Sequence, residues 1–150
     1  MKLEVERALA ARPGAVSIRA TGVYGRAPGA AEHKWSGLFV DYLAGRPVTP
    51  RRATEIHGAD LAAAILRLLE RPDVAGPLNA SDLDLDRHDL LAAVRGRAGG
   101  PPPPPRAEGP PPSVMATDRL AALGWRAGGQ ARLTAFLDAE FASRSGIPAG

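Results

Sequence analysis

The chain has 150 residues, 45% hydrophobic but only 5% aromatic, which suits one folded domain with a moderate aliphatic core. Its 19 cationic and 16 anionic side chains give a net charge of only +3, and the scattered arginines without interleaved aromatics disfavour nucleic-acid binding. No cysteine is present and no apolar run reaches about 18 residues, which excludes disulfides and thiolate catalysis and predicts no membrane segment and a cytoplasmic location.

The first half of the chain predicts three helices and two strands. In chain order we expect a helix at 3–12, a strand at 16–19, a loop at 21–29, a helix at 35–43, a strand at 54–57 and a helix at 60–69. The clearest helical stripe consists of Trp35, Leu38, Phe39, Tyr42 and Leu43. The last of these helices is expected to bury Leu61, Ile65, Leu68 and Leu69.

The second half continues the alternation. A brief strand is expected at 78–79, and Asp86 is the predicted N-cap of a helix that buries Leu90, Leu91 and Val94. Two helices are expected to close the chain, the first capped by Thr117 and the second with Leu133, Phe136, Leu137 and Phe141 on one face. Strands alternating with helices predict an α/β fold.

Residues 99–112 interrupt this pattern with eight prolines and three glycines. Such a segment cannot form the interior of a helix or sheet, so it is predicted to be a surface loop within the single domain 1–150. With no apolar anchor and little hydrogen-bonding capacity, we expect it to be mobile and readily cleaved near Arg106.

Four segments, taken together and in order, form a familiar series of motifs. They are 19–25 (RATGVYG), 55–62 (EIHGADLA), 76–82 (GPLNASD) and 118–125 (DRLAALGW). The series resembles the NAD-dependent epimerase/dehydratase family, the extended short-chain dehydrogenase/reductases. The resemblance implies part of a Rossmann-type sheet joined to a small substrate-binding lobe, NAD or NADP as cofactor, and a sugar-like or related carbonyl substrate.

The first residues resemble the end of that family's catalytic motif, Tyr-x-x-x-Lys followed by Leu-Glu-x-Glu. Lys2 then corresponds to the catalytic lysine, which binds the cofactor ribose and lowers the pKa of the tyrosine hydroxyl. The tyrosine would precede Met1, so we expect a C-terminal portion of a longer enzyme, truncated or with its start assigned too late, without the dinucleotide-binding half. A flexible terminal charge is the alternative role for Lys2.

The resemblance assigns further site residues. It implies that Ala20 and Thr21 contact the cofactor and that Gly22 and Val23 lie at the substrate, although an ordinary loop is the alternative. Some relatives carry an asparagine for a nucleotide-sugar at the position of Gly22. Lys34, together with the preceding histidine, is expected either to reach an anionic substrate or to begin the next helix.

Two further observations bear on which substrate and which metal, if any, the chain is expected to bind. Sugar-nucleotide epimerases carry an arginine where this sequence has Ala53, and Arg51 and Arg52 lie just before it. A side chain that is shifted by one residue along a strand points to the opposite face of the sheet. The case for a nucleotide-sugar substrate is therefore weaker. The histidines lack the local spacing of metal ligands, so no metal is expected.

The sequence therefore predicts an epimerase/dehydratase-like oxidoreductase that binds a small-molecule substrate. Its expected macromolecular partner is either the missing N-terminal half or another subunit of an oligomer. A non-catalytic remnant or interaction module of the same fold is the alternative.

Overall fold

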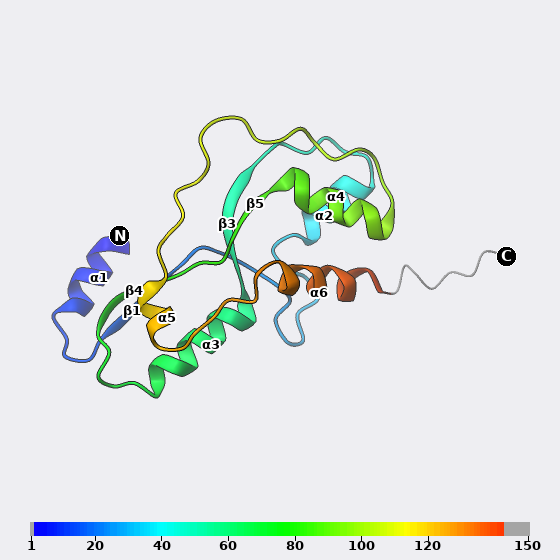
Figure 1. The fold of residues 1–150 in the computed structure, drawn as a ribbon. Coiled ribbons are helices and arrows are strands. Elements are labelled where there is room, and N and C mark those ends of the chain that lie inside the picture. The colour runs from blue at the N-terminus through cyan, green and yellow to red at the C-terminus, as the bar shows by residue number, and fades with distance from the viewer. Residues whose placement is uncertain (1, 143–150) are drawn as a thin grey trace.

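The computed structural model of the chain describes residues 2–142 (Figure 1). Its elements are α1 (Lys2–Ala10), β1 (Val16–Ala20), β2 (Gly22–Tyr24), α2 (Ser36–Leu43), β3 (Arg52–His57), α3 (Gly58–Leu69), β4 (Gly76–Ala80), β5 (Leu83–Asp86), α4 (Arg87–Ala98), α5 (Asp118–Ala122) and α6 (Gly129–Phe141). The predicted α/β class is confirmed, with a small parallel sheet element and a second lobe.

The strands form two small sheets. β1 pairs with β4 in parallel, from Val16 opposite Gly76 to Ala20 opposite Ala80. In the other sheet β3 lies between β2, which is parallel to it, and β5, which is antiparallel. Parallel neighbours require a long crossover, and the helices between these strands supply it. Within residues 2–142 no strand pairs with the second edge of β1.

The buried apolar residues form two cores, and Ile56 of β3 contributes to the core beside β1 and β4. The first, which we call the sheet core, consists of Ile56, Ala64, Leu68, Leu78, Ala80, Leu120 and Trp125. The second, the helical core, consists of Tyr24, Trp35, Phe39, Tyr42, Leu90, Leu91, Val94, Leu133, Leu137 and Phe141. Figure 1 shows β3 and β5 running from the region of α3 toward the group formed by α2, α4 and α6.

Several sequence expectations are corrected here. β2 lies within the expected loop at 21–29, and β5 was hidden because its leucines alternate with aspartates. In α3 the buried residues are Asp60, Ala64 and Leu68, whereas Ile65 and Leu69 are 44% and 75% exposed. The small Ala64 permits close approach of the helix to the sheet core, which turns the larger side chains outward.

The proline tract is held by polar contacts, contrary to the expectation of little hydrogen-bonding capacity. Four contacts hold it: Tyr42 Oη donates to Pro101 O at 2.5 Å, His88 Nδ1 lies 2.8 Å from Pro104 O, Arg106 forms a bidentate pair with Asp89, and Ala107 N donates to Asp86 Oδ2 at 3.1 Å. Residues 99–112 do lack helix and strand, as predicted. They do not lack hydrogen bonds, because their carbonyls accept from α2 and approach His88 of α4.

The carboxylate of Asp86 joins the proline tract to α4. The substitution Asp86→Ala is therefore expected to detach the tract at Ala107 and to remove the cap of α4. Asp86 Oδ1 accepts from His88 N at 2.8 Å as the helix cap, while Oδ2 holds Ala107 N. Loss of the cap costs about 1 kcal/mol, and trypsin cleavage after Arg106 should accelerate about tenfold. Mass spectrometry of timed digests measures this rate.

Asp84→Ala is the matched control, because Asp84 lies on the same strand but pairs outward with Arg52. Its digestion pattern at Arg106 should equal that of the unmodified chain. Cleavage at Arg106 before all other sites in the unmodified chain would restore the expectation of a mobile tract.

Candidate functional site

A groove of about 570 Å³ runs beside α1 and β1. It is lined by Lys2, Leu3, Val5, Glu6, Leu9, Ser17, Ile18, Arg19 and Ala20. Four consecutive residues of β1 contribute, so the groove follows the edge of the strand, since one face alone would take only alternate residues. The structure thereby brings Lys2 and Ala20, both expected at the cofactor, into one groove.

An ion pair holds α1 against β1 at this groove. Arg19 donates to Glu6 Oε1 from Nε at 2.8 Å and to Oε2 from Nη2 at 2.6 Å, and Ser17 Oγ donates to Oε1 at 3.0 Å. Hydrogen bonds from Arg19 lower the pKa of Glu6 to about 2, so the carboxylate stays ionised. Arg19 is occupied by this pair, and Lys2 is the other cation in the lining.

Thr21 lies just past the carboxyl end of β1. Its backbone amide donates to Ala80 O at 3.1 Å, and its Oγ1 is buried without a hydrogen-bond partner. A buried hydroxyl without a partner is uncommon. Thr21 follows Ala20 of the groove directly but is not in the lining, and its hydroxyl is buried rather than open to the groove.

Lys34, one of the residues expected at the substrate, lines a separate pocket of about 130 Å³. Its lining consists of Lys34, Trp35, Leu38, Arg51, Ala53, Glu55, Leu85, Arg87 and Leu90. Lys34 Nζ donates to Glu55 Oε1 at 2.6 Å, and Glu55 is only 5% exposed. Lys34 therefore lines the pocket, where the carboxylate of Glu55 already balances its charge.

Gly22 is required by this ion pair. A Cβ at its position would overlap Lys34 Nζ and the carboxylate of Glu55. Lys34 and Glu55 therefore occupy the space that a side chain at this position would need. Val23 is 41% exposed beside Gly22 and lies outside the lining of this pocket.

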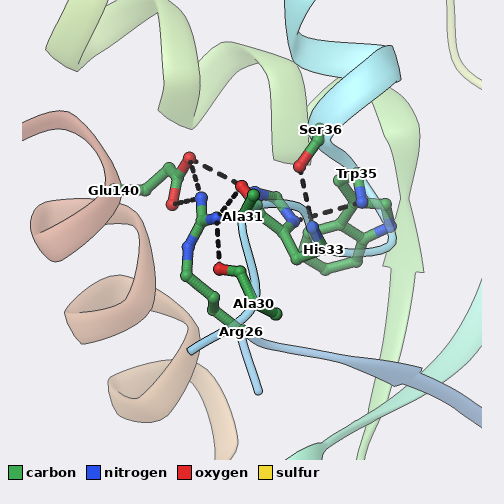
Figure 2. A network of polar contacts seen from close by, with 7 residues as sticks. All are labelled: Arg26, Ala30, Ala31, His33, Trp35, Ser36 and Glu140. Carbon is green, nitrogen blue, oxygen red and sulfur yellow. Dashed lines mark hydrogen bonds and ion pairs between the residues drawn. The ribbon is translucent and has the colours of Figure 1, made fainter. Parts of the chain in front are cut away.

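His33 does not face a substrate pocket. Its side chain is fully buried, with Nε2 3.3 Å from Glu140 Oε1 and Nδ1 accepting from Trp35 N at 3.2 Å (Figure 2). Burial tends to raise the pKa of Glu140, but Arg26 and His33 outweigh it and hold that pKa below its ordinary value. His33 thus lies in the turn that leads into α2 and contacts Glu140 of α6, in agreement with the alternative interpretation of a polar helix start.

A third polar cluster joins the two cores. Tyr24 is 1% exposed and stacks on Trp35 at 4.8 Å, and burial followed by the charge of Asp82 raises its pKa. Asp82 Oδ2 accepts from Gly129 N at 2.9 Å, and burial raises the pKa of Asp82. Asp60 Oδ2 accepts from Gly128 N at 3.0 Å. These carboxylates fix the start of α6, a role that their sequence positions did not reveal.

Comparison with known proteins decides the fold. No protein-family model and no curated protein matches the sequence. The crystal structure of the Thermus thermophilus UDP-glucose 4-epimerase in complex with NAD is similar, with 28% identity and a TM-score of 0.58 over 88% of this chain and 47% of that one. The chain has an epimerase-like fold.

The crystal structure of gox2253 supports the same fold at 14% identity, with a TM-score of 0.70 over 98% of this chain and 55% of that one. The epimerase-like chain thus spans about half the length of the structures it matches. Between residues 2 and 142 no helix is long and apolar enough to cross a membrane. The same residues contain no cluster of three or more acidic, histidine or cysteine side chains suited to a metal ion.

Proposed function

We propose that the chain is the substrate-side portion of an NAD(P)-dependent epimerase/dehydratase-like oxidoreductase that acts on a sugar-like or related carbonyl substrate. The supporting observation is that Lys2 and Ala20, the residue at the carboxyl end of β1, line one groove in a fold similar to that of an epimerase crystallised with NAD. In α/β sheets ligands bind outside the carboxyl ends of the strands.

The residues that line the groove suit the ribose side of a dinucleotide rather than its pyrophosphate. Lys2 offers an ammonium for ribose hydroxyls, and the small Ala20 permits close approach. Apolar side chains on α1 and β1 would exclude water from the groove. When bound, NAD(P) supplies the hydride acceptor.

The pyrophosphate side is not provided by this sequence. No two of its 17 glycines are separated by a single residue, so it contains no G-x-G-x-x-G loop. We therefore propose that a second α/β unit, either an N-terminal half or another subunit, completes the cofactor site. The same absence favours the alternative, a non-catalytic interaction module of this fold.

Binding of NADH separates the two proposals. Titrated calorimetrically into the 150-residue chain, NADH is expected to bind more weakly than about 1 mM, because helix N-terminal amides for the pyrophosphate are missing. Fusion to the unmatched half of the Thermus epimerase should bring binding into the micromolar range. Lys2→Ala in the fusion should then weaken binding about tenfold.

Lys34→Ala in the same fusion is the control, because Lys34 lines the other pocket and should leave NADH affinity unchanged. Micromolar binding by the isolated chain would contradict the need for a second unit. A folded fusion that ignores NADH would favour the interaction module instead.

A further inference from the structure

The pocket of about 130 Å³ carries an unbalanced positive charge. Lys34, Arg51 and Arg87 line it together with a single carboxylate, Glu55. Glu55 is committed to Lys34 through the contact at 2.6 Å. Two guanidinium groups therefore remain without a carboxylate partner among the described residues.

These two arginines repel each other. Burial, followed by the charge of Arg51, lowers the pKa of Arg87 below its ordinary value. Arg87 donates one hydrogen bond from Nη1 to Thr49 O at 2.7 Å, which leaves other donors of its guanidinium uncommitted. Two like charges on a partly buried wall are unfavourable alone and become favourable around an anion.

Arg51 immediately precedes β3, and its carbonyl accepts from Arg87 N at 2.8 Å, which places the two arginines side by side. The neighbouring Arg52 pairs with Asp84 through an Nε–Oδ1 contact of 2.8 Å, outside the pocket lining. Arg51 and Ala53, two residues apart, both line the pocket. Positions two apart along a strand share a face, which is consistent with Arg51 and Ala53 lining the same pocket.

We propose that this pocket binds the acid group of a small acidic substrate, a carboxylate or phosphate held between Arg51 and Arg87. The volume is below the roughly 300–1,000 Å³ of common ligand sites, so it suits one acid group rather than a nucleotide. Arginine forks match both oxyanions. Apolar walls from Trp35, Leu38, Leu85 and Leu90 strengthen the attraction.

The proposal rests on the proposed function in treating the ligand as the substrate, and its test requires no cofactor. The full 150-residue chain is titrated calorimetrically with glucose 6-phosphate, glucuronate, UDP-glucose and neutral glucose. We expect one of the two small acids to bind, which identifies phosphate or carboxylate as the source of the oxyanion, and glucose not to bind.

Arg51→Gln and Arg87→Gln should each weaken that binding at least about tenfold. Arg52→Gln removes the same charge from the adjacent position and should change it less than about twofold. Arg51 is exposed, so its variant remains informative even where Arg87→Gln perturbs folding.

Equal weakening by Arg52→Gln, absence of binding by both small acids, or tighter binding of UDP-glucose than of either acid would overturn the proposal. Acid binding that depends on Arg51 in a fusion that fails to bind NADH would overturn the proposed function alone.

Discussion

Asp60→Ala is expected to lower the free energy of unfolding by about 2–4 kcal/mol. The Asp60 side chain is nearly fully buried, and its carboxylate accepts from Gly128 N at 3.0 Å and from Arg132 Nη2 at 3.2 Å. Its removal leaves a part-buried amide without an acceptor and a guanidinium without its ion-pair partner. A whole domain is held by only about 5–15 kcal/mol, so the loss is a large fraction.

The effect is large because Asp60 joins the two cores. Its backbone carbonyl accepts from Trp125 Nε1 at 2.9 Å in the sheet core, while its side chain positions the residues that lead into α6 of the helical core. Urea denaturation followed by tryptophan fluorescence measures the change. Trp125 in one core and Trp35 in the other report on both.

Two further variants provide an intermediate case and a surface control for Asp60→Ala. Asp60→Asn keeps an acceptor for Gly128 N and loses only the charge, so about 1–2 kcal/mol is expected. Asp138→Ala removes an exposed carboxylate paired with Arg97 and should cost no more than about 1 kcal/mol. If Asp60→Ala were as mild as Asp138→Ala, the Asp60 carboxylate would not be what holds α6.

The helices of the helical core were predictable because their apolar residues recur at helical spacing. Leu90, Leu91 and Val94 are buried as expected, and Asp86 caps α4. Strand β5 was not predictable, because aspartates at alternate positions resemble a solvated acidic run. Pairing with β3 gives Asp84 its partner Arg52, whereas Asp86 bonds to His88 N and Ala107 N. Thr117 precedes α5 as predicted, but its side chain makes no capping hydrogen bond.

The candidate site was predictable only in part. Lys2 and Ala20 were assigned to the cofactor by resemblance, and their shared groove depends on the pair of Glu6 with Arg19, which no spacing revealed. The acid-binding pocket draws its lining from α2, β3, β5 and α4 and from residues just before α2 and β3. Arg87 is the first residue of α4, and only the antiparallel return of β5 brings it near Arg51.

Self-association is the other large effect that we expect, for the 150-residue chain expressed by itself. The second edge of β1 has no strand partner within residues 2–142, and unpaired edges promote pairing between chains. Beside this edge, Leu3 and Val5 are 64% and 55% exposed. Size-exclusion chromatography should therefore show species larger than the 15.6 kDa monomer.

The double variant Leu3→Lys/Val5→Lys should shift the chain toward monomer. Full burial of each side chain is worth about 1.5–3 kcal/mol, so losing even half of it weakens association at least about tenfold. Val40→Lys, at a 60% exposed site on α2, is the control and should leave the elution unchanged. Fusion to a Rossmann half should cover the same edge and likewise give a single monomeric peak with a cooperative thermal melt. If the unmodified chain already ran as a monodisperse monomer with such a melt, the edge would need no partner, and a self-sufficient binding module would be the better interpretation.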